Sequence, residues 1–475
     1  MKVSRNAAFL VTLATVVGSN AWAADEMDVG DWEARFQLMS ERMEQLEGEL
    51  DETRGELDET RGELRGARDE LDESRVRVDR QEQVIERAGL DRTAASGLSR
   101  FYQELEISGW VSASWLWNFN NPDESTAGSG VNQGFDGAFY PFHPDHNSFE
   151  VNQVWFELEK PVTEESRAGF RTSFVWGKTA GQLGSPSHRT GYVTDVDFAA
   201  DEFSLAGGGD SASDFYLYRA YVQYLTPIGL RIRAGKFGTL LGAEVAETIY
   251  NFNITRGNVY NLLQPLVHYG VIIDGSSGPF AYSLGAVNRG ACCGLDPDTN
   301  NAKSVLAQLK YQGGETWWLA TSIEWGAEAD GNSSGEEGRL DVLANWQPTE
   351  SFSSWLDFDY VWNHANQEAF GLALAGRYAI TEAAGFALRA EWVMDVNNLL
   401  GFTDPGGGPP PDDTVIWGVT GTFDYTIVEN LLGRVELRWD HVDNGGAPND
   451  QFINSSGEYT RADQIVGGLE LIYQF

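Results

Sequence analysis

The 475-residue chain is poor in long hydrophobic runs, in cysteine and in positive charge. Beyond its N-terminal segment, no stretch approaches the eighteen consecutive apolar residues of a transmembrane helix, which excludes a helical membrane protein. The only two cysteines, Cys292 and Cys293, are adjacent, so they could form a strained vicinal disulfide or stay reduced. Acidic residues outnumber basic ones by 71 to 33, and the net charge of −38 argues against a nucleic-acid partner.

The N-terminus has the pattern of a secretory signal peptide. Lys2 and Arg5 precede an uncharged, largely apolar run at residues 7–17, and the small residues Ala21 and Ala23 follow in "SNAWAAD". We therefore predict that residues 1–23 are a signal peptide that is cleaved after Ala23. A retained signal anchor is the alternative, although the apolar run is short for a membrane-spanning helix.

Residues 29–90 carry a seven-residue repeat, which is clearest in "GELDETRGELDETRGEL" at 48–64. Leucines recur at one core position of the heptad, while glutamates and arginines occupy the two flanking positions that face a parallel partner helix. This pattern predicts a coiled coil of identical chains, and a single solvated helix is the alternative. We assign to oligomerisation Leu50, Leu57, Leu64, Leu71, Glu49, Arg54, Glu56 and Arg61, and we take residues 91–103 as a linker.

From Glu104 to Phe475, apolar residues recur at every second position in segments of about ten residues. Seven tight turns alternate with eight longer breaks and so separate sixteen strands. An even strand number, with short connections on one side and long ones on the other, is typical of an outer-membrane barrel. The predicted fold is an all-β transmembrane barrel at 104–475, 16-stranded and antiparallel, preceded by a short α-helical coiled coil. A soluble sandwich is the alternative, but it would need no consistent outward face of Trp, Tyr and Leu.

A family resemblance is visible in several segments, taken in order along the chain. Among them are "ISGWVSASWLWNFNNP" (107–122), "SFEVNQVWFELEKP" (148–161) and "YRAYVQYLTPIGLRIRAGKFGTLLGAEV" (218–245). Over residues 101–475 the chain resembles the trimeric outer-membrane porins, and more closely the putative β-barrel porin-2 (OmpL-like) family.

This resemblance implies passive diffusion of small hydrophilic solutes or ions across the cell outer membrane. It also implies a homotrimer in contact with the lipid bilayer and lipopolysaccharide. The final strand, which ends in Phe475, resembles the signal that the barrel-assembly machinery reads. A structural tether that acts through the coiled coil in the periplasm is the alternative function.

The alternation also predicts which charged side chains face the interior of the barrel. The candidates for the pore lining are Arg231, Arg233, Asp357, Asp359, Arg389, Glu391, Arg434, Glu436, Arg438 and Asp440. Residues 240–266 form the third long break and are less polar than a solvated loop, so we expect them to fold inward and narrow the channel. We place Glu244 and Glu247 at this constriction, with ordinary exposed loop charges as the alternative.

No catalytic set is visible in the sequence. The six histidines are scattered, and no nucleophile elbow, zinc-protease motif or phosphate loop is present. The segment "FHPDHN" at 142–147 could place His143, Asp145 and His146 around a metal, but such loops are more typical of cation bridging to lipopolysaccharide. We therefore expect no enzyme activity, no cofactor and no metal site.

Overall fold

The computed structural model describes residues 101–122, 140–143, 146–183, 215–288, 301–327, 335–402, 413–444, 452–456 and 459–475, with isolated positions between 37 and 68. The chain divides into two compact units, Met1–Arg100 and Phe101–Phe475. In the first unit the described positions, Leu57 and Arg61 among them, are helical. The predicted signal peptide and six of the predicted coil residues lie outside the described residues: Leu50, Leu64, Leu71, Glu49, Arg54 and Glu56.

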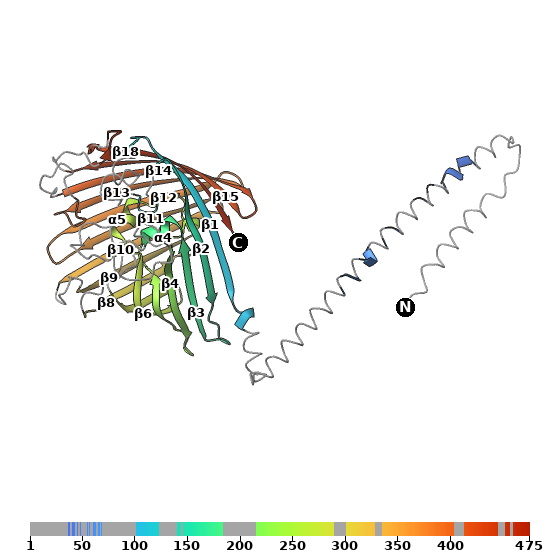
Figure 1. The fold of residues 1–475 in the computed structure, drawn as a ribbon. Helices are drawn as coiled ribbons and strands as arrows, with labels where there is room; N and C mark the ends of the chain where they lie inside the picture. The colour runs from blue at the N-terminus through green and yellow to red at the C-terminus, as the bar shows by residue number, and fades with distance from the viewer. Residues whose placement is uncertain are drawn as a thin grey trace, which may run out of the picture. The chain divides into compact units, whose positions relative to one another are not determined.

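The second unit is a closed barrel of sixteen antiparallel strands, so the predicted strand number and architecture are confirmed (Figure 1). Consecutive strands pair along the chain, and β18 closes the barrel by pairing with β1. The strands are β1 (Glu106–Asn118), β2 (Ser148–Lys160), β3 (Ala168–Trp176), β4 (Phe215–Leu225), β5 (Arg231–Gly238), β6 (Val267–Ser277), β7 (Phe280–Val287), β8 (Ser304–Gln312), β9 (Trp317–Ala327), β10 (Glu336–Thr349), β11 (Phe352–Trp362), β12 (Glu368–Ala379), β13 (Ala384–Val396), β14 (Asp413–Val428), β15 (Leu431–Asp443) and β18 (Asp463–Gln474).

Short and long connections alternate around the barrel, except that the connection at 363–367 on the long side is shorter than the turn at 161–167. We call the two ends of the barrel the tight-turn end and the long-loop end. The second long connection contains α4 (Lys178–Leu183), and the eighth contains the small hairpin of β16 (Phe452–Ile453) and β17 (Tyr459–Arg461). The third contains η2 (Thr248–Tyr250) and α5 (Asn258–Leu263). Among the described residues, no helix is both long enough and apolar enough to cross a membrane.

The two faces of the barrel wall follow from the two-residue period of a strand. In β15, Arg434, Glu436 and Arg438 are buried, whereas Val435 and Leu437, which alternate with them, are more than half exposed. Similar exposed rows of apolar side chains run along the other strands. An outward apolar band of this kind is stable only against lipid, because in water it would remain unburied.

The seam between β1 and β18 pairs residues 110–118 with residues 466–474, and Gly109 and Phe475 extend it by one further pair. The backbone N–H of Gly109 donates to Phe475 O at 3.1 Å, and the N–H of Phe475 donates back to Gly109 O at 3.0 Å. The Phe475 ring covers Gly109 so closely that an added Cβ would lie 2.6 Å from it. The same Cβ would lie 2.3 Å from the backbone oxygen of Trp155 on β2, so only glycine fits here without displacing a neighbour.

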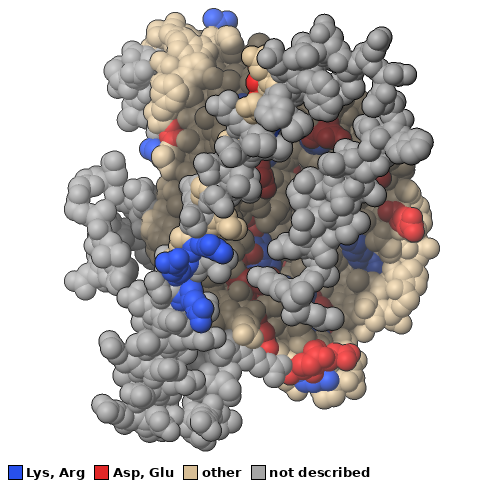
Figure 2. Space-filling view, turned by 90° about the vertical axis from the view of Figure 1, so that its right-hand side faces the viewer, with Lys and Arg blue, Asp and Glu red and all other residues tan. Residues whose placement is uncertain are grey.

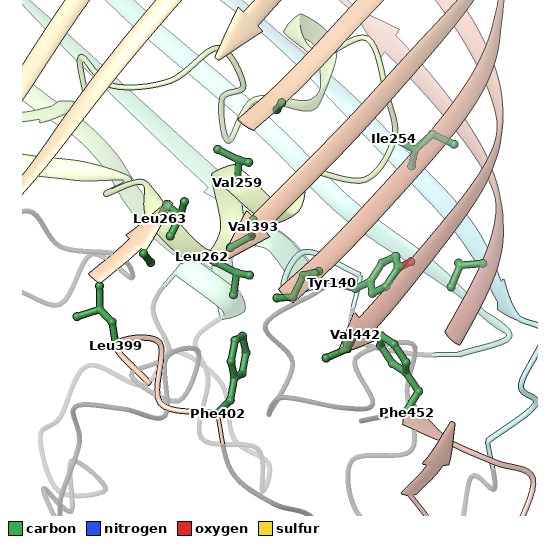
Figure 3. Close-up of a cluster of buried hydrophobic side chains, with 14 of the residues drawn as sticks. Tyr140, Ile254, Val259, Leu262, Leu263, Val393, Leu399, Phe402, Val442 and Phe452 are labelled. Atoms are coloured by element: carbon green, nitrogen blue, oxygen red, sulfur yellow. The ribbon is translucent and has the colours of Figure 1, made fainter. Parts of the chain in front are cut away.

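The interior contains hydrophobic clusters as well as charges. Val259, Leu262 and Leu263 of α5 pack against apolar side chains such as Val393 and Val442, which project inward from the wall (Figure 3). On another part of the wall the rings of Trp110 and Trp155 stack at 5.1 Å. Only charged inward-facing residues of the wall were named from the sequence. The wall also turns apolar side chains inward, because the loops that enter the barrel bring apolar side chains that need partners.

Candidate functional site

The third long connection, residues 239–266, lies inside the barrel and is called the inner loop below. Its first residues contact strands β8 to β11. Leu240 O accepts hydrogen bonds from Gln308 Nε2 at 2.7 Å and from Ser322 Oγ at 3.1 Å. The backbone N–H groups of Gly242 and Ala243, which follow closely, donate to the carboxylates of Asp341 and Asp357 on the wall. The loop therefore starts by attaching to the wall through its own backbone.

Arg389 of β13 connects the middle of the inner loop to the wall. Its side chain is completely buried, and its Nη1 donates to Glu244 Oε1 and to Thr255 O, both at 2.7 Å. Its Nε donates to Glu391 Oε2 at 2.9 Å. Burial raises the pKa of the Glu244 carboxyl, and the Arg389 cation acts in the opposite direction. One arginine thus holds two buried carboxylates, one from the loop and one from the wall.

Strand β15 holds the next part of the loop. Glu436 accepts hydrogen bonds from the backbone N–H groups of Ile254 at 2.6 Å and Thr255 at 3.0 Å. Arg438 donates to Arg256 O at 2.6 Å and also pairs with Asp440 at 2.9 Å. These bonds fix the loop backbone with charged groups, which form stronger hydrogen bonds than neutral groups do.

Further contacts attach the loop to β2 and β4, early strands of the barrel, and again to β15. Glu247 pairs with Arg219 Nη2 of β4 at 2.6 Å, and Gln153 Nε2 of β2 donates to Ala246 O at 2.7 Å. Arg434 Nη1 donates to Thr248 O at 3.1 Å. Because β2 and β4 lie far from β10 and β11 around the barrel, the inner loop spans the lumen from one side of the wall to the other.

The ten residues named as pore-lining candidates all come from inward-facing positions, but they do not form one group. Eight of them lie around the inner loop, from Asp357 on β11 to Asp440 on β15. The other two, Arg231 and Arg233, pair with Asp274 of β6 at 3.1 and 2.7 Å, close to the tight-turn end. Both loop carboxylates, Glu244 and Glu247, are buried ion-pair partners and not exposed loop charges.

Sequence reasoning missed several residues that hold the loop. They are Gln153, Arg219, Gln264, Asp341 and Glu470. The alternation that places Glu436 inward applies equally to Glu470 and Asp341, so the signal for these two was present. No strand pattern marks Gln264, which belongs to the loop itself.

The tight-turn end of the lumen also contains charges of both signs. Arg171 pairs with Glu159 at 3.5 Å, and Arg377 donates to Asp424 at 2.9 Å. Figure 2 shows basic and acidic side chains within a hollow that the barrel surrounds. Arg171 and Arg377 keep 28% and 32% of their side chains exposed, so they contact the water of the lumen.

The histidines of "FHPDHN" have separate hydrogen-bond partners. His143 Nδ1 lies 3.0 Å from Asn152 Nδ2, whereas His146 Nδ1 accepts from the backbone N–H of Asn118 at 2.9 Å. Burial lowers the pKa of His143 to about 3, so this ring is neutral at physiological pH. Asp145, the third residue of the metal alternative, lies outside the described residues.

Comparison with known proteins gives one family match. Residues 104–475 match the model of the family described as Putative beta-barrel porin-2, OmpL-like. No curated protein matches the chain. Similar solved structures include the outer membrane channel DcaP of Acinetobacter baumannii (12% identity, TM-score 0.48, 78% of this chain and 97% of that chain covered). Another is OprB of Pseudomonas putida, with 10% identity and a TM-score of 0.48 over 81% of this chain and 96% of that chain. An anion-selective porin from Comamonas acidovorans has 8% identity and a TM-score of 0.46 over 78% of this chain and 99% of that chain.

Proposed function

The chain belongs to the Putative beta-barrel porin-2, OmpL-like family, and on this premise we propose that it is a passive diffusion channel of the outer membrane. Its solutes would be small and hydrophilic, or simple ions. The observation that carries this proposal is the closed barrel with an apolar outer face and a charged interior that a long loop crosses.

We propose that the inner loop is the constriction and that the eight predicted pore-lining residues around it act there. Carboxylates and guanidinium groups around the loop create a field across the lumen, which favours hydrated polar solutes over apolar ones. The hydrophobic clusters around α5 fill part of the cross-section. We therefore expect a narrow channel and a small conductance.

Planar-bilayer recording of the purified protein tests the function directly. We expect stable conductance steps in KCl and a modest cation preference, because the chain is strongly acidic and charged pore mouths enrich counter-ions. A correctly inserted barrel that passes no ions would contradict the channel function and would favour the tether alternative.

The charge group near the tight-turn end offers a test of selectivity. Asp274 accepts hydrogen bonds from Arg233 Nε at 2.7 Å and Ser283 Oγ at 2.8 Å, and it pairs with Arg231, whose side chain is 43% exposed. In Asp274→Asn, Arg231 and Arg233 no longer have a carboxylate as their ion-pair partner. We expect the cation-to-anion permeability ratio to fall by about twofold, because uncompensated positive charge then faces the lumen.

The measurement is the zero-current potential in a KCl gradient. The control is Glu382→Gln, which removes an exposed carboxylate in a turn at the same end of the barrel. Equal potentials for the wild-type protein and Asp274→Asn would show that ions do not sense this charge group.

For the N-terminal region we propose a parallel coiled coil in the periplasm that helps to hold identical barrels together as a trimer. The repeated Glu and Arg flanks support it, because they pair between in-register helices. Contacts between barrels would already favour the trimer, so the coil adds avidity. We also propose that lipopolysaccharide surrounds the outer face, and that the assembly machinery recognises the strand that ends in Phe475.

Charge reversal tests the coil without altering any strand. Changing Arg54, Arg61, Arg68 and Arg75 together to Glu places like charges opposite each other, at a cost of a few tenths of a kcal/mol for each pair. We expect the oligomer to dissociate more readily in mild detergent at low salt and to recover partly at high salt. If the oligomer of this variant has the same mass as the wild-type oligomer under both conditions, the coil does not help to hold the barrels together.

A further inference from the structure

Three buried aspartates lie together where the inner loop meets β10 and β11. Asp341 and Asp359 are direct cross-strand partners, and Asp357 is two residues away on the same inward face of β11. Asp341 and Asp359 are completely buried, and Asp357 is 2% exposed. One carboxylate oxygen from each lies within 4.8 Å of the others. Like charges directly opposite in an antiparallel pair destabilise it, so the arrangement requires compensation.

The protein supplies little of that compensation. Among the described residues, no Lys or Arg is ion-paired with any of the three aspartates, whereas Glu244 and Glu391 nearby share Arg389. The cross-strand neighbours on the flanking strands are uncharged: Ser322 beside Asp341, and Gly371 and Ala373 beside β11. Arg339, two residues from Asp341 on β10, forms its ion pair with Glu324 at 2.6 Å and not with the cluster. Several carboxylates that are buried without an ion-paired cation carry a large desolvation cost.

The hydrogen bonds to the cluster leave one oxygen of each carboxylate without a partner. Gly242 N–H donates to Asp341 Oδ2 at 3.2 Å, and Ala243 N–H donates to Asp357 Oδ2 at 2.9 Å. Gln264 Nε2 donates to Asp357 Oδ2 at 2.9 Å and to Asp359 Oδ2 at 2.8 Å. All four bonds use Oδ2, and the buried Oδ1 atom of each aspartate has no hydrogen-bond partner within the described residues.

We propose that Asp341, Asp357 and Asp359 bind a divalent cation, calcium by preference, which fixes the inner loop to the wall. Calcium accepts a site built largely from protein oxygens, whereas magnesium dehydrates reluctantly and usually keeps several waters. The three aspartates are buried and their carboxylate oxygens lie within 4.8 Å of one another, so this dry cluster of oxygens suits calcium better than magnesium.

The ion connects the two ends of the loop as well as the loop and the wall. Gly242 and Ala243 lie near the start of the inner loop and Gln264 near its end, yet all three donate to the same cluster, and Asp357 accepts from both ends. A cation that neutralises these carboxylates therefore stabilises both loop ends in place. Without the ion, mutual repulsion of the carboxylates weakens the attachment at both ends.

The test is calcium binding by the full-length protein in detergent. The protein is freed of metal, and CaCl₂ binding is measured by calorimetry, with MgCl₂ in parallel. We expect one calcium site per chain that is lost in Asp357→Asn and in the double variant Asp341→Asn/Asp359→Asn, and weaker binding of magnesium. The control is Glu350→Gln, which removes an exposed carboxylate in the turn between β10 and β11, and this variant should keep the site.

A second readout needs no variant. The thermal unfolding midpoint of the wild-type protein should rise with CaCl₂, and this rise should disappear in Asp357→Asn. Identical calcium binding by wild type and Asp357→Asn, or a wild-type midpoint that CaCl₂ leaves unchanged, would overturn the proposal; the carboxylates would then be kept neutral by protons. Neither measurement depends on conductance, so a failed channel assay leaves this proposal open to its own test.

Discussion

Replacing Arg389 with methionine is expected to release the inner loop and to raise the conductance of the channel. The Arg389 guanidinium is the shared partner of Glu244 on the loop and Glu391 on the wall. Methionine keeps much of the side-chain volume but leaves both carboxylates without this cation, at a cost of about 3–5 kcal/mol for breaking a buried pair. The lost stability should affect the attachment of the loop and not the barrel wall, because the backbone hydrogen bonds between strands are unchanged.

Single-channel recording measures this effect, as a larger conductance with more frequent fluctuations. The control is Arg377→Met on β12, which breaks an ion pair with Asp424 near the tight-turn end. Among the described residues, Arg377 makes no hydrogen bond to the inner loop. Wild-type conductance and noise in Arg389→Met would show that the other contacts hold the loop without this pair.

Replacing Gly109 with alanine is expected to hinder closure of the barrel. The added Cβ would lie 2.3 Å from the backbone oxygen of Trp155 and 2.6 Å from the Phe475 ring. The ring can turn aside, but the Trp155 oxygen belongs to the neighbouring strand β2 and cannot move without disturbing its pairing with β1. Overpacking of this kind costs about 1–3 kcal/mol, and here it displaces β1, the strand that must pair with β18 to close the barrel.

The fraction of folded barrel can be measured from its mobility in unheated detergent gels and from the thermal unfolding midpoint. Gly421→Ala in β14 is the matched control, because a Cβ there would meet only the Phe386 ring, at 3.5 Å. We expect the control to fold like wild type and Gly109→Ala to fold in lower yield and unfold at lower temperature. Equal behaviour of the two variants would mean that the seam tolerates a side chain.

The barrel wall could be predicted from the sequence because lipid imposes a strict rule on it. A shift of one residue in β15 would turn Arg434, Glu436 and Arg438 toward the membrane, so the alternation specifies their side unambiguously. The inward path of the inner loop was predictable for a related reason. Its apolar residues need a surface to pack on, and the barrel interior supplies one.

The partners of the inward side chains could not be predicted in the same way. Asp341 and Asp359 face each other because of the register between β10 and β11, and a single strand's alternation carries no information about register. The alternation therefore placed Asp357 and Asp359 on the inward face, but it could not place Asp341 opposite Asp359. The stacked pair of Trp110 and Trp155 was missed because each strand was expected to turn its aromatic residues toward lipid.

The inner loop links strands that lie on the two sides of the seam between β1 and β18. It contacts Gln153 and Arg219 on early strands and also Arg434 on β15, beside the seam. In the wall, β15 reaches the early strands only through β18 and β1. The loop therefore joins through the lumen the same strands that the seam joins through the wall. We expect closure of the wall and docking of the loop to stabilise each other, because each brings the partners of the other together.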